Sequence, residues 1–247
     1  MNTRATTESI KTLTEPVGHL GGHWMLHPEV MEPCRAAGYP NGYVYYGAGR
    51  GGVLGDVDAD VIAAAFGFFE PSLVRRMWEA GTAVEGAAAA AARYGAACVE
   101  FGRSRLQGFA EAERVAELAE RVALGADATG LPLFAGWRRQ PLPDDLPGRA
   151  YFLMHLLREL RGGAHVVAVV ASGLAPRDAV LASGGADMAK LFGWPEPYGD
   201  PAGIDKQPAE QLTDAIVGRL YDDVLNNEEV KELAELVISM RAHFDGA

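Results

Sequence analysis

The sequence predicts an all-α fold, a single-domain array of about ten helices, and three observations carry that prediction. Apolar side chains recur at the spacing of a helix, most clearly from Val61 to Phe69. Residues that favour helix starts precede such runs, with Asp58 suited to an N-cap and Pro71 to a first turn. Strand and helix patterns do not alternate. The β-branched run 166–170 has no partner strand, so we read it as a buried helix that begins near Ala164.

Proline and glycine divide the predicted helices near the start of the chain. Residues 1–7 are expected to be disordered, and residues 8–15 to form a first helix that Pro16 ends or kinks. Glycines 21–22 are expected to loosen the chain before Pro28 opens the next helix.

The next stretch contains one ambiguous segment between clear helices. Residues 38–42 are rich in glycine and proline and are expected to form a loop, and residues 43–50 fit either a short strand or a buried helix. Helices then follow from Asp58 and from Pro71, and the alanine-rich stretch 82–101 predicts a long helix because alanine has the highest helix propensity.

In the second half, a proline-rich connection over 130–147 separates an amphipathic helix from a strongly apolar one that Gly162 and Gly163 interrupt. Residues 194–209 are expected to be irregular because prolines and glycines are frequent there. The remaining helices are expected over residues 111–124, 151–161, 176–182, 187–192, 210–224 and 228–243.

Composition excludes several classes of function. The chain has 247 residues, 49% of them apolar, and a formal net charge of −11, so its surface as a whole repels a phosphate backbone. Cys34 and Cys98 are too few for a disulfide framework and are expected to be buried thiols in a reducing compartment. No signal peptide or apolar run of about 18 residues is visible. We therefore expect a cytoplasmic protein with no nucleic-acid or membrane partner, and we leave a homodimer open.

The densest group of chemically active side chains is His19, His23 and His27, spaced i, i+4, i+8. On a continuous helix they share one face, where imidazoles can ligate a transition metal or haem, with Glu29 or Glu32 as a carboxylate ligand. The glutamate that a metalloprotease helix carries between its histidines is missing. The alternative, which we favour, is that these histidines line a pocket or the surface and no cofactor is bound.

A second signal is the run from Gly47 to Gly52, which fits the spacing G-x-G-x-x-G. A dinucleotide site needs a helix directly after this run and a surrounding βαβ unit, and neither is present. We expect instead a glycine-rich loop that lets the backbone approach a ligand. Arg50 in that loop would bind a carboxylate or phosphate, or else cap a helix or pair with Asp56.

A third signal combines two arginines, a glutamate and a histidine beside the Gly162–Gly163 pair. His165 would act as a general acid or base near Arg158, Glu159 and Arg161, or else be a hydrogen-bonded core residue. His155 lies on an apolar face and is expected in the core or in a pocket wall. Aromatic residues that would line an apolar pocket, or form core, are Tyr43, Tyr45, Tyr46, Phe66, Phe68 and Phe69.

Two segments carry a resemblance to a known family: YGAGRGGVLGDVDADVIAAAFGFFEPSLVRRMW from Tyr46 to Trp78, and LLRELRGGAHVVAVVASGL from Leu156 to Leu174. They resemble a little-characterised bacterial all-helical family usually labelled helix-turn-helix or MarR-like. The first motif of that family is similar to G-R-A-A-P-L-G followed by an aromatic-rich helix that ends in proline, and the other is similar to L-R-E-H-R-G-D-G-H. The matching positions are Arg50, Leu54, Gly55, Phe66, Pro71, Arg158, Glu159, Arg161, Gly162 and His165.

The departures from this resemblance bear on function. Val53 replaces the proline of the first motif, Leu160 the middle histidine of the other, and Gly163-Ala164 its Asp-Gly pair. The family's winged helix would lie within residues 194–209, an interval too short for three helices and a hairpin. The resemblance, which covers residues 10–193 and the last two helices, therefore implies the family's helical pocket without its DNA-reading segment.

These observations lead to two hypotheses. The first is an enzyme of small-molecule metabolism, including specialised metabolism, with lyase, isomerase or cyclase chemistry. Arg158 and Arg50 would hold an anionic group while His165 and Glu159 move a proton. The predicted substrate-binding residues are Tyr46, Arg50, Phe66, His155 and Arg161. The second hypothesis is a non-catalytic small-molecule-binding or regulatory protein that acts through a partner and does not bind DNA.

Overall fold

The computed structural model describes residues 3–247, with side chains from residue 8 onward, and every regular element in that part of the chain is a helix. This confirms the all-α prediction. The α-helices are α1 (Thr3–His23), α2 (Pro28–Met31), α3 (Gly42–Gly51), α4 (Ala59–Phe66), α5 (Pro71–Glu85), α6 (Ala87–Arg105), α7 (Ala112–Gly125), α8 (Pro132–Trp137), α9 (Leu146–Ala171), α10 (Pro176–Leu191), α11 (Gln207–Asp222) and α12 (Asn227–Asp245). Three 3₁₀ turns are η1 (Pro33–Arg35), η2 (Gly52–Leu54) and η3 (Pro201–Gly203).

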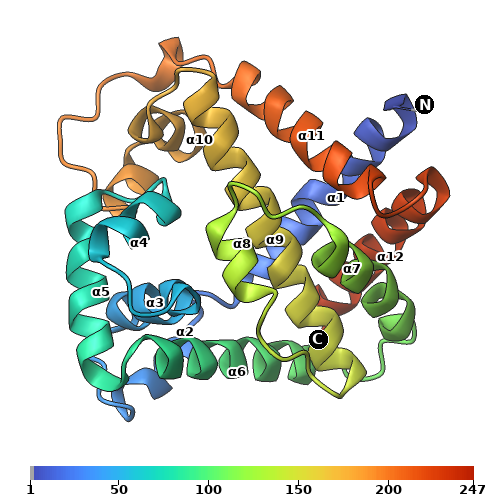
Figure 1. The fold of residues 1–247 in the computed structure, drawn as a ribbon, viewed down its shortest axis with the longest axis horizontal. Helices are drawn as coiled ribbons and strands as arrows, with labels where there is room; N and C mark the ends of the chain where they lie inside the picture. Colours follow the sequence, from blue (N-terminus) through green and yellow to red (C-terminus); the bar gives the residue numbers. More distant parts are fainter. Residues whose placement is uncertain (1–2) are drawn as a thin grey trace.

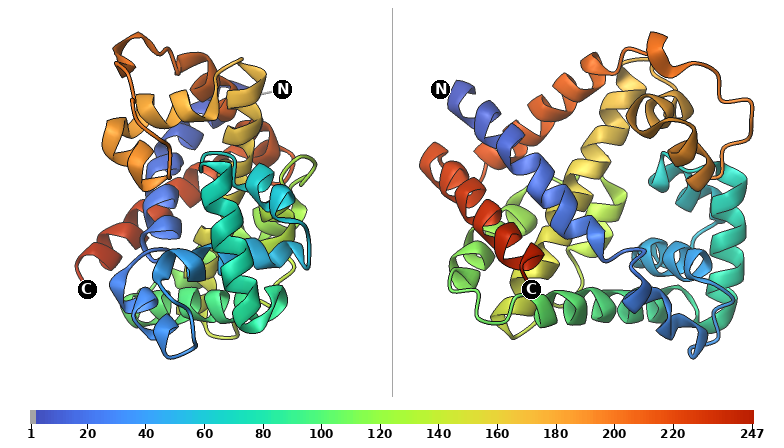
Figure 2. Two further views of the ribbon diagram at one scale, coloured as in Figure 1. Left: turned by 90° about the vertical axis from the view of Figure 1, so that its left-hand side faces the viewer. Right: turned by 180° about the vertical axis from the view of Figure 1, so that it is seen from behind.

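Helix α9 is the centre of the arrangement. It packs against α1, α6, α7, α8 and α11, so it is covered over most of its length. Figure 1 shows α3, α4 and α5 on one side of the molecule, with α6 running along its lower edge towards α9. Viewed from behind, α1 and α12 lie side by side, and α1 also packs on α9 (Figure 2). The molecule thus has two groups of helices, α3–α5 and those around α9.

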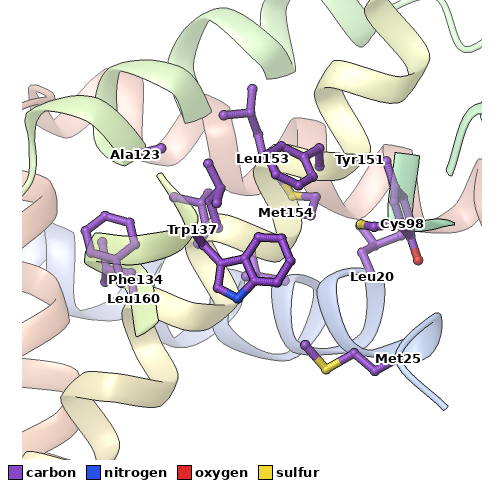
Figure 3. Close-up of a cluster of buried hydrophobic side chains, with 14 of the residues drawn as sticks. Leu20, Met25, Cys98, Ala123, Phe134, Trp137, Tyr151, Leu153, Met154 and Leu160 are labelled. Atoms are coloured by element: carbon purple, nitrogen blue, oxygen red, sulfur yellow. The ribbon is translucent and has the colours of Figure 1, made fainter. Parts of the chain in front are cut away.

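The main core forms where α1, α6, α8 and α9 meet (Figure 3). Trp137 of α8, Leu20 of α1, Cys98 of α6 and Leu153 of α9 are fully buried there. Trp137 also donates a hydrogen bond from Nε1 to the carbonyl of Arg50 (3.2 Å), which ties α8 to the end of α3. Both cysteines are free and buried, as expected.

Helix α1 is longer than the sequence pattern indicates. It begins at Thr3, within the segment expected to be disordered, while residues 1 and 2 lie outside the described residues. It does not end at Pro16 and includes Gly21 and Gly22, so the predictions that Pro16 ends the helix and that the glycines loosen the chain were wrong. A Cβ on Gly21 would lie 2.5 Å from the carbonyl oxygen of Met154, so the glycines let α1 touch α9. Burial against α9 keeps the segment helical despite its proline and glycines.

The segment 43–50 is helical, which resolves its ambiguity, and the prediction of a glycine-rich loop was wrong. The Asn41 side chain caps α3 by accepting a hydrogen bond from the backbone N–H of Val44 (3.0 Å). A Cβ would lie 2.5 Å from Met77 Cβ at Gly47 and 2.5 Å from Tyr94 Cβ at Gly49. The glycines therefore serve close packing of α3 against α5 and α6, not the approach of a ligand.

Two further boundaries differ from the predictions. Gly162 and Gly163 do not interrupt α9, which is continuous to Ala171. The long alanine-rich helix is instead divided at Gly86, whose φ of 78° is unfavourable for other residues. Figure 1 shows the chain turning a corner there, from α5 into α6.

The rest of the chain follows the predicted pattern closely. The 130–147 connection contains the short helix α8, and the two short helices of 176–192 are joined as α10 across Gly185, whose φ is 63°. Apart from η3, the segment between α10 and α11 has no regular structure, and α11 and α12 close the chain as expected. Within residues 3–247 no single helix has the length and apolar composition to cross a membrane. The bent pair α9–α10 meets those criteria only when its two helices are counted together.

Candidate functional site

A cavity of about 650 Å³ lies where α1, α3, α4, α8 and α9 meet. Its volume is in the range of small-molecule sites. The structure gathers most of the predicted site residues around this cavity, although they are far apart in the sequence. Those that line it are His23, His27, Tyr46, Arg50, Phe66, Arg158, Arg161 and His165.

Arg50 and Glu159 form a buried ion pair that joins α3 to α9. Arg50 donates from Nε to Oε1 (3.0 Å) and from Nη2 to Oε2 (2.9 Å) of Glu159, and from Nη1 to the hydroxyl of Tyr46 (3.0 Å). The guanidinium carbon lies 4.8 Å from the centroid of the Phe66 ring, a cation–π distance. Every nitrogen of this guanidinium thus has a partner within the protein.

The carboxyl group of Glu159 is held ionised. Burial alone would raise its pKa, but the charges of Arg50 and Arg158 lower it to about 2. The side chain is 1% exposed and does not border the cavity. Glu159 binds Arg50 and Arg158 and keeps them in position, so the geometry does not favour the predicted role of moving a proton.

Arg158 reaches the cavity because α1 has no side chain in its way. A Cβ on Gly22 would lie 2.9 Å from the Nε of Arg158. Only Nη1 of this guanidinium has a partner in the described part of the protein, Oε1 of Glu159 at 3.0 Å. The side chain is 30% exposed, so its remaining N–H groups are available to a ligand.

Arg161 lies one helical turn further along α9. Its Nη2 donates to Oε2 of Glu210 on α11 (3.2 Å). Its Nε is buried and has no hydrogen-bond partner among the described residues. The side chain is 25% exposed, so the N–H groups at the end of the guanidinium, and not the enclosed Nε–H, are open to a ligand.

His165 is held by a chain of two hydrogen bonds to α11. Its Nδ1 is 2.8 Å from Oγ1 of Thr213, and that hydroxyl lies 2.7 Å from the carbonyl of Ala209. The hydroxyl has one proton, and only the hydroxyl can donate to the carbonyl, so Nδ1 must carry a hydrogen and donate to Thr213. Burial lowers the pKa of His165, which favours the neutral ring with Nε2 as an acceptor.

Aromatic rings form much of the apolar wall. Phe69 stacks on Phe192 with a centroid distance of 4.2 Å and an angle of 14°, and Phe68 lies 5.3 Å from the ring of His165. Tyr46 and Phe66 complete this side of the cavity. Of the other predicted aromatics, Tyr43 and Tyr45 do not line it.

His155 lies in the core rather than in the cavity wall. It is fully buried, with ring centroids 5.2 Å from Trp24 and 4.6 Å from Trp137 in edge-on contacts. Neither ring nitrogen has a hydrogen-bond partner of good geometry among the described residues, although the backbone of Gly21 interacts with the ring. Burial lowers its pKa to about 3, so the ring is neutral. Its position fits the core alternative and not substrate binding.

The three N-terminal histidines lie close together, but only His19 and His23 are on α1, because the helix ends at His23 and His27 instead caps α2. Ring centroids are 5.1 Å apart for His19–His23 and 5.4 Å for His23–His27, and His19 also contacts Asp245 (3.0 Å). Glu29, named as a further ligand, pairs with Arg105 at 2.9 Å instead. No group of three or more His, Cys, Asp or Glu among the described side chains is arranged to hold a metal ion. Metal or haem binding stays a prediction.

Sequence reasoning missed three contributors to the site. Glu210 and Thr213 come from α11, about fifty residues beyond their partners Arg161 and His165, and Phe192 follows α10. No motif links these positions in the sequence. The one signal for Glu210 and Thr213 is that α11 is amphipathic, which predicts that this helix packs on another helix but not on which one.

Comparisons with known proteins give one match. Residues 9–202 match the family model described as "Helix-turn-helix family". No curated protein and no solved structure matches the chain.

Proposed function

The chain belongs to the helix-turn-helix family, and from that premise we propose that it binds a small, largely apolar molecule in the cavity between α9 and the α3–α4 pair. The observation that carries this proposal is the cavity of about 650 Å³ with its aromatic wall. Apolar pockets with a few convergent polar groups are the usual form of small-molecule sites. Arg158, Arg161 and His165 supply such groups here.

In this proposal the protein is a binding or regulatory protein that acts through a partner and not through DNA. Its net charge of −11 opposes contact with phosphate. Between α10 and α11 the described structure has only the single turn η3, which supports the proposed absence of a winged helix in that segment. We propose the cavity as cofactor-free and the protein as cytoplasmic.

The test blocks the cavity without disturbing the helix. Gly162 lines the cavity, and a Cβ there would meet nothing within 4 Å, so Gly162→Phe places a ring in the site without a backbone clash. Gly203→Phe is the matched control, since Gly203 is exposed, equally unobstructed and outside the cavity. The probe is N-phenyl-1-naphthylamine, a neutral aromatic dye that fluoresces in apolar sites. We expect binding to the native protein and Gly203→Phe and its loss in Gly162→Phe. Equal binding by all three proteins would refute the proposal.

A second candidate is acid–base catalysis in the same cavity, and the bonding of His165 favours it. The two hydrogen bonds through Thr213 leave Nε2 as the free acceptor of a neutral ring that borders the cavity. A general base requires this state near neutral pH. Such a base would serve the predicted lyase, isomerase or cyclase chemistry.

Isotope exchange separates binding from catalysis. Ligands that raise the melting temperature of the protein are incubated with it in D₂O, and mass spectrometry records deuterium incorporation or a new product. Catalysis predicts exchange or turnover that His165→Gln abolishes while ligand binding persists. Binding without exchange in the native protein would leave the non-catalytic function.

A further inference from the structure

Three arginines border the cavity, but they are not equivalent. All three nitrogens of Arg50 are bonded within the protein, and the side chain is 7% exposed. Arg158 uses one nitrogen and Arg161 uses one, and both lie on α9 three residues apart, on neighbouring positions of one face. The donors left for a ligand therefore belong to Arg158 and Arg161.

Among the arginines that border the cavity and the carboxylates paired with them, one cation is in excess. Among the side chains that the structure describes, no aspartate or glutamate lines the cavity. Two carboxylates behind the wall, Glu159 and Glu210, pair with the three arginines. Asp214 interacts with Arg161 and with Lys11, and Lys206 interacts with His165, but none of Asp214, Lys11 and Lys206 borders the cavity.

We infer that the cavity selects an aromatic acid with a single negative charge, and that Arg158 and Arg161, not Arg50, hold its acid group. This inference rests on the proposed binding function. The acid group would accept hydrogen bonds from the exposed N–H groups of Arg158 and Arg161 that have no partner among the described residues, and its charge would balance the excess cation. The aromatic body would lie against the wall formed by Phe66, Phe68, Phe69 and Phe192. The sequence motif predicts that Arg50 holds the anion, but in the structure Arg50 links α3 to α9 through Glu159.

The experiment compares two dyes that differ by one charge. 1-Anilinonaphthalene-8-sulfonate is the sulfonate of the neutral dye N-phenyl-1-naphthylamine, so the pair isolates the acid group. We expect the native protein to bind the anionic dye about tenfold more tightly, because a charge-assisted contact typically contributes that much. Arg158→Gln and Arg161→Gln should each remove most of this preference and leave the affinity for the neutral dye unchanged. An unchanged melting temperature, measured by circular dichroism, shows that the variants are folded.

The control variant is Arg139→Gln, which removes an exposed arginine that does not border the cavity. It should keep the full preference for the anion. Equal affinity of the native protein for both dyes, or a preference that survives in Arg158→Gln and Arg161→Gln, would overturn the inference and leave the binding function intact. Failure of both dyes to bind the native protein would overturn the binding function itself, and the inference with it.

Discussion

Removing Glu159 tests whether the buried ion pair organises the site. Glu159→Leu leaves the guanidinium of Arg50 buried without its two bonds of 3.0 and 2.9 Å. Breaking a buried pair by removing one partner typically costs about 3–5 kcal/mol of unfolding free energy. The lowered pKa of Glu159 indicates a stabilisation of the folded state of similar size. A change from the ordinary 4.5 to about 2 corresponds to about 3 kcal/mol of stabilisation at neutral pH.

Urea denaturation followed by circular dichroism measures this loss, and a double variant identifies its cause. In Arg50→Met with Glu159→Leu no buried charge is left, so we expect it to be more stable than Glu159→Leu alone. The melting temperature of Glu159→Leu should fall by roughly 10 °C. A loss below about 1 kcal/mol in Glu159→Leu, or a double variant as unstable as the sum of the single ones, would refute the reasoning.

Acid should weaken the same pair. Because the pKa of Glu159 is lower in the folded than in the unfolded state, its contribution is complete above about pH 4.5 and is lost as the pH falls towards about 2. Denaturation midpoints of Glu159→Gln should therefore vary less than those of the native protein over this interval. An identical pH dependence in the two proteins would contradict this assignment.

Three further outcomes are expected. His155→Phe should reduce the loss of stability as the pH falls from 6.5 towards 3. In this range the imidazole of His155 is protonated in the unfolded chain but stays neutral when it is buried in the folded protein. Thermal melts at pH 7 and pH 4 measure the difference. Gly102→Ala should lower the free energy of unfolding by about 2 kcal/mol or more, because its Cβ would lie 2.2 Å from Tyr151 Cβ. Gly218→Ala, whose Cβ would have nothing within 4 Å, should raise the free energy of unfolding by up to about 1 kcal/mol. Urea denaturation measures both, and equal effects would be inconsistent with the packing argument. A labelled DNA duplex should show no retardation even at low salt, and a retarded band that weakens steeply with salt would establish DNA binding.

The sequence determined the fold class and the identity of many site residues. Helical periodicity and capping residues such as Asp58 and Pro71 act locally, so they are visible without a structure, and α4 and α5 begin where they predict. The motifs around Arg50 and Arg158 also marked residues that share one cavity.

Tertiary structure decided what those residues do. Glycine has the same local preference in a loop and at a helix crossing, and only the positions of Met77 and Tyr94 show that Gly47 and Gly49 serve packing. The same holds for α1, where contact with α9 outweighs the helix-breaking effect of Pro16.

The different roles of the three arginines show most clearly what the sequence alone does not assign. The sequence does not distinguish Arg50, Arg158 and Arg161 from one another, because each is a cation near a glycine. The pairing of Arg50 with Glu159 and of Arg161 with Glu210 joins α3 and α11 to α9, segments that are far apart along the chain. Which guanidinium is satisfied within the protein and which is left for a ligand is therefore a property of the tertiary structure.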